Sequence, residues 1–277
     1  MMMVLAYAGP LFVAMAGPLL LRWQGGAERA ARWGGVFTAI GFFVGWQVLV
    51  GPDWIPKAAH DRIGHIALGA ALIGIAIDVV APRPWVRGIL IGGLIAGSVW
   101  ISVAGGFSMR KLPPAALLVG GATLAAAWAG TVVRFEAMRD HPATVQTIAL
   151  MALIGVAILA FTVGDAVVAK AALAAALAWT GHAIGCRLTS SATVSWAATL
   201  VVAATLFGGA WAMAATRPAA APGLAILLFM LFADQTARRV PMPGGRISDL
   251  LYVLVLAAMA AIPLILAIVV TAARLPN

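Results

Sequence analysis

The chain has 277 residues, 63% of them hydrophobic and 10% charged, with a mean hydropathy of +1.03. Ordinary globular domains are roughly 45–50% apolar and about 25% charged, so this composition excludes a soluble fold. The net charge of +9 would suggest a nucleic-acid partner in a soluble protein. Here the 18 Lys and Arg residues flank apolar runs singly or in pairs, so we expect membrane lipids as partners and no nucleic acid.

Apolar runs long enough to cross a hydrocarbon core of about 30 Å recur along the whole chain. They predict an all-α, polytopic bundle of about ten membrane-spanning helices with short loops, forming one domain over residues 1–277. The run at Pro222 reaches spanning length only if it continues through Asp234. The predicted segments are Val4–Leu21, Gly35–Val50, Ile63–Val80, Val86–Ala104, Pro113–Val133, Val145–Val163, Ala166–Gly185, Val194–Ala214, Pro222–Phe232 and Leu250–Ala272.

Two prolines, Pro10 and Pro18, interrupt the first segment, and each follows a glycine. A proline inside a helix removes a hydrogen bond and leaves a carbonyl free. The pair therefore predicts a kinked first helix. Discontinuous helices of this kind also form midplane binding sites in transporters.

The third segment ends in a carboxylate, Asp78, shortly before Pro82. One interpretation is an interfacial ion pair with Arg83 or Arg87. The other is a proton site, because a carboxylate buried among apolar helices is driven towards its protonated form. Asp78 is the first candidate for a substrate or proton path.

Glycines at short intervals mark the fourth segment, which contains Gly88, Gly92, Gly93 and Gly97. Small residues at this spacing let the backbones of two membrane helices approach closely. The pattern predicts that another helix packs tightly against this segment.

Two charged residues, Asp165 and Lys170, stand at the start of the seventh segment, after a turn confined to Gly164 and Asp165. Five residues separate them, about 140° around a helix, so they are poor partners for an ion pair. We expect Asp165 to cap the helix and Lys170 to extend its ammonium to the membrane surface. Both remain candidates for a substrate or proton path.

Near the end of the same segment, His182 lies four residues before Cys186 on one helical face, which could indicate a metal pair or a proton relay. No third ligand is evident, and haem would need facing histidines, so we expect neither metal nor cofactor. A hydrogen-bonded histidine near the interface is favoured.

The last candidate is Asp234, four residues before Arg238. That spacing predicts a salt bridge at the membrane edge. A gate for an ion or substrate at the cytoplasmic mouth is the functional alternative.

Tryptophans are expected to be of two kinds. Rings near segment ends favour the headgroup boundary, whereas those inside segments favour packing. The first group is Trp23, Trp33, Trp54, Trp85 and Trp100, and the second is Trp46, Trp128, Trp179, Trp196 and Trp211.

Basic residues also predict orientation, since 11 of the 18 Lys and Arg residues fall in the odd-numbered connections and 7 elsewhere. The positive-inside bias then places the odd connections in the cytoplasm and both termini outside. The arginines expected to face the cytoplasm include Arg29, Arg32, Arg139, Arg238, Arg239 and Arg246.

Two functions fit these features. The first is a small secondary transporter or channel, indicated by the ten helices, the Gly-Pro pairs and the membrane carboxylates. The alternative is a non-catalytic accessory or assembly subunit that binds other membrane subunits, indicated by the scarcity of midplane polar residues and by the glycine-rich faces. The sequence favours the transporter, in a bacterial inner membrane. An enzyme is least favoured, because no clustered carboxylates or histidine pair mark a segment end.

Overall fold

A computed structural model describes residues 2–51, 55–56, 58–110, 114–189, 194–241 and 248–275. Within these ranges the chain forms helices and no β-strand. The elements in chain order are α1 (Met2–Leu49), α2 (Arg62–Val80), α3 (Pro84–Arg110), α4 (Pro114–Ala137), α5 (Pro142–Thr162), α6 (Ala166–Leu188), α7 (Trp196–Thr216), η1 (Pro218–Ala220), α8 (Ala221–Leu227), η2 (Leu228–Phe232), α9 (Ala233–Ala237) and α10 (Ser248–Ala272).

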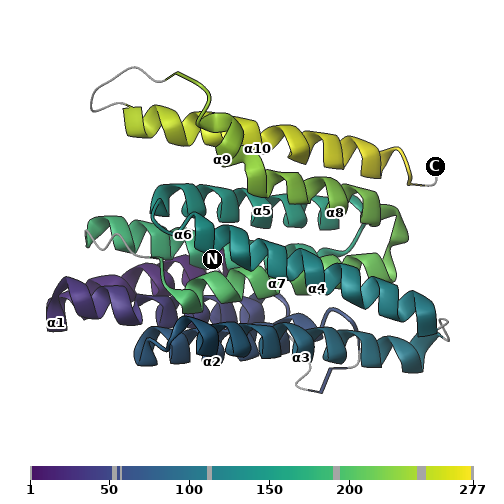
Figure 1. The fold of residues 1–277 in the computed structure, drawn as a ribbon, viewed down its shortest axis with the longest axis horizontal. Coiled ribbons are helices and arrows are strands. Elements are labelled where there is room, and N and C mark those ends of the chain that lie inside the picture. The colour runs from purple at the N-terminus through teal and green to yellow at the C-terminus, as the bar shows by residue number, and fades with distance from the viewer. Residues whose placement is uncertain are drawn as a thin grey trace.

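The long helices lie side by side along the longest dimension of the molecule (Figure 1). Within the described residues, eight segments are long and apolar enough to cross a membrane, and they coincide with the last eight of the ten predicted segments. The first two predicted segments fall in α1. The chain is therefore a multi-pass, all-α membrane protein, as its composition predicts.

A sharp bend divides α1 into two helical arms, 2–24 and 27–49. It lies at Gly25 and Gly26, and Gly26 has a φ of +77°, in the left-handed region that favours glycine. The arms fold back on each other, since a β-carbon at Gly41 would lie 2.7 Å from the carbonyl oxygen of Pro10. α1 is thus a helical hairpin that accounts for the first two predicted segments.

The first arm keeps helical backbone angles through Pro10 and Pro18, so neither proline breaks the helix, and the break in α1 lies at Gly25 and Gly26. Each proline ring lies instead against glycine on a neighbouring helix. A β-carbon at Gly45 would come within 2.6 Å of the Pro10 ring, and one at Gly185 within 3.1 Å of the Pro18 ring. The prolines fill space that these glycines leave open.

The tight connection between α5 and α6 confirms the predicted hairpin. Gly164 has a φ of +77°, and the Asp165 carboxylate accepts a hydrogen bond of 3.1 Å from the backbone N–H of Val168. Asp165 is therefore the N-cap of α6, as expected for a short polar residue before an apolar helix.

The segment that begins near Pro222 does continue through Asp234, as a spanning length requires. η1, α8, η2 and α9 together form one membrane span, Pro218–Ala237. Its middle part, η2, has 3₁₀ geometry, which is tighter than an α-helix and is rarely sustained for more than 3–4 residues. The helical pattern is locally interrupted there.

Tryptophan burial follows the predicted division wherever side chains are described. Trp23, Trp85 and Trp100 are 83%, 64% and 73% exposed, and Trp33 is also exposed. Trp46, Trp128, Trp179 and Trp196 are buried, and Trp211 is half-buried. Trp54 lies outside the described residues.

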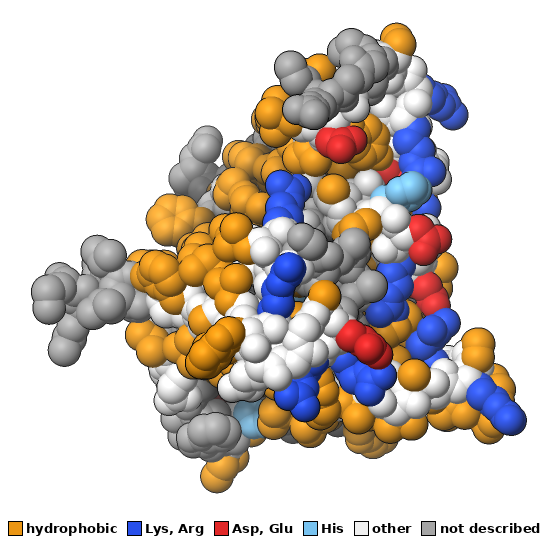
Figure 2. Space-filling view, turned by 90° about the vertical axis from the view of Figure 1, so that its left-hand side faces the viewer, with side chains coloured by type: hydrophobic (Ala, Val, Ile, Leu, Met, Phe, Trp, Pro, Cys, Tyr) orange, Lys and Arg blue, Asp and Glu red, His pale blue; other side chains and the backbone are white. Residues whose placement is uncertain are grey.

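Charged side chains gather at one end of the bundle, which faces the viewer in Figure 2. Several contacts join the odd-numbered connections there: Arg22 of α1 donates to the carbonyl of Thr189 after α6, and Arg139 after α4 lies 4.0 Å from Asp78 of α2. The odd connections therefore share one end, called the charged end below. Its assignment to the cytoplasm stays a prediction.

Candidate functional site

The densest polar cluster lies at the charged end, where α2 meets the first turn of α7. Gly74 allows this approach, because a β-carbon there would lie 2.7 Å from the backbone nitrogen of Ala197. One turn later on the same face of α2, Asp78 reaches the N-terminus of α7. Its two carboxylate oxygens accept hydrogen bonds of 2.9 Å from the backbone N–H groups of Trp196 and Ala197.

Asp78 thus acts as a second cap on α7, beside the helix's own N-cap residue. Ser195 Oγ accepts from the backbone N–H of Ala198 at 3.1 Å. The two side chains together satisfy three of the four N–H groups that a helix leaves unbonded at its start. The negative charge of Asp78 also lies at the positive end of the α7 dipole.

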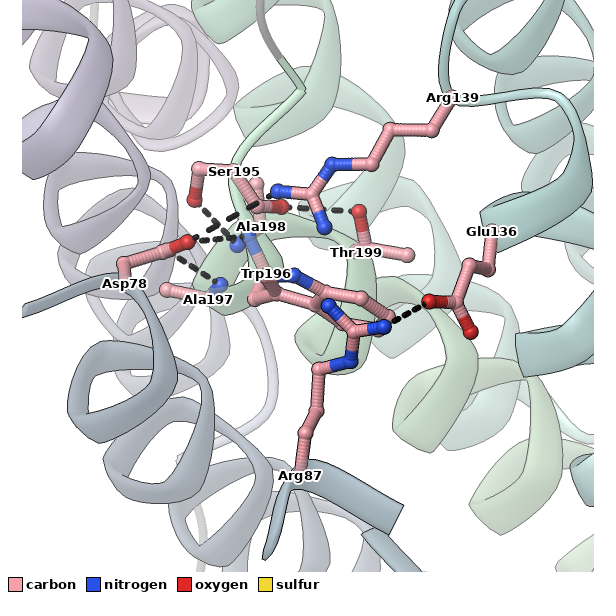
Figure 3. A network of polar contacts seen from close by, with 9 residues as sticks. All are labelled: Asp78, Arg87, Glu136, Arg139, Ser195, Trp196, Ala197, Ala198 and Thr199. Carbon is pink, nitrogen blue, oxygen red and sulfur yellow. Dashed lines mark hydrogen bonds and ion pairs between the residues drawn. The ribbon is translucent and has the colours of Figure 1, made fainter. Parts of the chain in front are cut away.

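Two arginines complete this cluster around the indole of Trp196 (Figure 3). The guanidinium carbons of Arg139 and Arg87 lie 4.5 and 5.0 Å from the ring centroid, distances at which a cation is attracted to an aromatic face. Arg139 approaches from above and Arg87 from below in that view. Arg139 also lies 4.0 Å from Asp78, and Arg87 donates to Glu136 at 2.5 Å.

Each charge in the cluster lies within 4.0 Å of an opposite charge, and these contacts join α2 to the segment after α4 and α3 to α4. The sequence indicated Arg83 or Arg87 as the partner of Asp78, but the structure places Arg139 there and gives Arg87 to Glu136. Burial lowers the pKa of the Arg139 guanidinium, and the nearby Asp78 carboxylate raises it. The Asp78 side chain is 9% exposed.

Asp234 occupies a second ion pair at the charged end. It is 4% exposed and accepts from Arg134 of α4 at 2.5 Å. Arg134 also donates to the carbonyl oxygen of Leu231 in η2, at 3.1 and 3.2 Å. The predicted partner Arg238 is present too, 3.8 Å away, but it is half exposed.

His182 is 2% exposed, less than two turns before the end of α6. Its Nε2 lies 3.4 Å from the sulfur of Cys186, and a backbone hydrogen bond links the ring to Gly34. The described residues contain no group of three His, Cys, Asp or Glu side chains that could hold a metal ion. The geometry is that of a buried, hydrogen-bonded histidine.

Asp165 and Lys170 lie at the opposite end of the bundle. Asp165 caps α6 and lies 3.4 Å from the hydroxyl of Thr216, while Lys170 is exposed. The five candidate residues therefore do not form one site: Asp78, Asp234 and His182 belong to the charged half and the other two to the far end.

The hollows lined by described residues include the following three. An apolar one of about 80 Å³, the inner cavity, lies between α4, α5, α7, α8 and η2. A groove of about 380 Å³, the α2–α3 groove, runs between those helices, and a hollow of about 590 Å³ lies at the charged end beside α5, α6 and α10. Neither Asp78 nor His182 lines any of the three.

Sequence reasoning missed Arg139, Arg134 and Glu136 as partners, and placed Trp196 only among packing residues. Each contact joins residues far apart in the chain, 100 positions for Arg134 and Asp234. The sequence did show an excess of Lys and Arg in the odd connections, but such an excess does not say which of them pair with a carboxylate.

No model of a known protein family matches the chain, and no curated protein matches it.

Proposed function

We propose that this membrane protein is a non-catalytic accessory or assembly subunit, and that its α3 face packs against a transmembrane helix of a partner subunit in a bacterial inner membrane. The observation that carries the proposal is a set of four open glycines on α3. β-Carbons built at Gly88, Gly92, Gly93 and Gly97 would meet nothing within 4 Å, and Gly93 and Gly97, four residues apart, lie on one side of the helix.

Glycines elsewhere in the bundle show why this face is unusual. Gly41, Gly74 and Gly181 each lie against the backbone of a neighbouring helix, so glycine in this chain commonly marks close helix packing. The span of α3 is 17% buried, against 78% for α7. Small residues favour helix association in membranes by permitting close approach. A β-carbon at any of the four open glycines of α3 would meet no neighbouring helix among the described residues.

The α2–α3 groove gives this face a suitable shape. Gly93 and Gly97 line it, as does Gly69 of α2, together with apolar side chains such as Ile73 and Ile89. A transmembrane helix with its side chains is about 10–12 Å across, and a groove with small residues along its floor accepts a row of side chains on such a helix.

The membrane carboxylates also favour an accessory subunit over a transporter. A transporter needs a polar site near the midplane that water or substrate can reach. Asp78, Asp165 and Asp234 instead bond to helix N-termini or to arginines at the two ends. Bonds to helix N-termini and to arginines are typical of carboxylates that stabilise a fold.

The proposal is tested by photo-cross-linking in membranes of the native host. A photoreactive amino acid at position 89 of α3, an exposed position that lines the α2–α3 groove, should give a discrete adduct with one membrane protein, which mass spectrometry identifies. The double variant Gly93→Leu/Gly97→Leu should abolish the adduct and the co-purification of that protein in mild detergent.

The matched control is Gly130→Leu on α4, which also places a leucine where a β-carbon meets nothing within 4 Å, but outside the α2–α3 groove. The Gly130→Leu variant should still form the adduct and co-purify with the partner protein. Adducts with lipid alone, or unchanged co-purification of the double variant, would contradict the proposal. Substrate uptake by vesicles of the purified chain would favour the transporter.

A further inference from the structure

The hollow of about 590 Å³ at the charged end, called the α5–α10 hollow below, has no part in the proposed contact on α3. Its walls come from the start of α5 and the two residues before it, from the last turn of α6 and from the first turns of α10. Three membrane spans begin or end at these points, so the hollow lies at the depth of the lipid headgroups. Its volume is within the range of small-molecule sites, roughly 300–1,000 Å³.

The first turn of α5, on the wall of this hollow, has no side-chain cap. His141 at the N-cap position makes no capping hydrogen bond, whereas Asp165 caps α6 and Ser195 caps α7. Pro142 has no N–H, and the backbone N–H of Ala143 has no hydrogen-bond partner among the described residues. A helix end with free N–H groups is positively polarised and binds anions.

A second unpartnered donor on the wall is the hydroxyl of Thr144, a residue that is 2% exposed. Within the described ranges it has no hydrogen-bond partner, whereas Thr147 donates its hydroxyl to the carbonyl oxygen of Ala143 at 2.8 Å. The unpartnered hydroxyls of Thr38 and Thr271 are closed off completely, but that of Thr144 keeps accessible surface. Buried hydroxyls are normally satisfied, so this one indicates an acceptor that enters from the hollow.

Charges of both signs line the α5–α10 hollow without pairing with each other. Arg187, in the last turn of α6, is exposed and forms no ion pair with a described residue. Asp140 and Asp249 are exposed carboxylates on the same wall, and neither forms an ion pair with a described side chain. A guanidinium and two carboxylates that leave each other unpaired fit a ligand that carries a negative and a positive charge.

The hollow continues into the lipid-facing surface of α10. Leu250, on its wall, is 61% exposed, and Leu254, one turn further along the helix, is 57% exposed. The span of α10 as a whole is 22% buried. A ligand with its charged part in the hollow can therefore lay hydrocarbon chains along α10, which favours a lipid over a soluble compound.

We propose that the α5–α10 hollow binds the headgroup of a phospholipid that carries a phosphate and a primary amine, as phosphatidylethanolamine does. The phosphate accepts hydrogen bonds from the guanidinium of Arg187, the hydroxyl of Thr144 and the N–H of Ala143. The ammonium group lies beside the carboxylates of Asp140 and Asp249. The site is independent of the proposed partner helix, whose groove is formed by α2 and α3.

The test measures lipid binding to the full, delipidated chain in mild detergent by native mass spectrometry. Phosphatidylethanolamine is compared with phosphatidylglycerol, which has the phosphate but no amine. A positively charged surface by itself attracts phosphatidylglycerol more strongly, because that lipid has a net negative charge. Phosphatidylethanolamine should nevertheless bind about fivefold more tightly, the gain of one hydrogen bond to a carboxylate. Equal binding, or a preference for phosphatidylglycerol, would overturn the proposed ligand.

A second comparison separates the lipid from a soluble phosphate ester. Glycerophosphoethanolamine has the same headgroup without acyl chains, so it should displace phosphatidylethanolamine only when present in large excess. Displacement at equal concentrations would overturn the lipid as the ligand of the hollow.

Side-chain variants test the site itself. Arg187→Gln should weaken binding of phosphatidylethanolamine about tenfold, and Thr144→Val, which keeps the size of the side chain, about fivefold. The double variant Asp140→Asn/Asp249→Asn should lose the preference for the amine. The matched control Arg239→Gln, at an exposed arginine of the charged end outside the hollow, should bind like the unchanged chain. Equal losses in Arg187→Gln and Arg239→Gln would show a general attraction to phosphate and overturn the site.

Discussion

Asp78 and Trp196 are 118 residues apart in the chain, yet an oxygen of the Asp78 carboxylate lies 2.9 Å from the backbone nitrogen of Trp196. This bond fixes the end of α2 against the start of α7. Arg139, which lies beside both residues, adds the segment between α4 and α5 to the same contact. A single carboxylate therefore ties together three parts of the charged end.

We predict that Asp78→Ala lowers the free energy of unfolding by about 1–3 kcal/mol, because two buried backbone N–H groups and a partly buried guanidinium lose their acceptor. Thermal unfolding in detergent measures the change. Asp249→Asn, at an exposed carboxylate in the first turn of α10, should leave the midpoint nearly unchanged. If Asp78→Ala were as stable as the unchanged chain and lost pH-dependent transport, the transporter would be favoured instead.

Arg134 and Asp234 should behave as a buried pair. Asp234→Asn or Arg134→Met alone should each destabilise by about 3–5 kcal/mol, because the remaining group is left uncompensated, whereas the double variant should cost less than the sum. A double-mutant cycle of unfolding free energies measures the coupling. Arg238→Gln, at the exposed partner, should cost about 0–1 kcal/mol. Strict additivity of the two single changes would show that the pair is not coupled.

Leucine substitutions should distinguish glycines packed against another helix from glycines on the open surface. Gly181→Leu should destabilise by about 1–3 kcal/mol or prevent folding, because its side chain would meet the backbone of Leu11 in α1. Gly88→Leu faces open space and should leave the isolated protein folded. Yields and melting temperatures in detergent compare the two, and equal behaviour would argue against the α1–α6 contact.

Lys170 should be dispensable for folding. Its side chain is exposed on the second turn of α6, so Lys170→Met removes no buried ion pair and should leave abundance in the membrane nearly unchanged. Quantitative immunoblotting of membranes measures this. A severe loss of protein would reveal a charge partner that this arrangement does not contain.

The orientation of the bundle can be tested with single introduced cysteines, because the chain's own Cys186 is buried. Cysteines at positions 29 and 239, at the charged end, should resist a membrane-impermeant reagent applied to intact cells. A cysteine at position 217, at the opposite end, should react. Ready labelling of position 239 from outside the cell would show that the predicted orientation is wrong. Arg246 lies outside the described residues.

Local features determined what the sequence could reveal. Apolar length determines where a helix can cross a bilayer, and a three-residue connection around Gly164 forces α5 and α6 into a hairpin. Asp165 caps the helix that follows it for the same reason, since a capping bond joins residues three apart. These properties depend on neighbours in the chain, so they were predicted correctly.

Only the tertiary structure decided which distant residues meet. Nothing near Asp78 in sequence distinguishes Arg139 from Arg83 as its partner, because an ion pair depends on where two helices end in space. Likewise, glycine permits close packing at Gly181 and at Gly92 alike, but only the packed bundle shows that α1 lies against the first and that the second faces outward. The apolar composition determines that the chain lies in a membrane, whereas the arrangement of the helices determines which distant side chains come into contact.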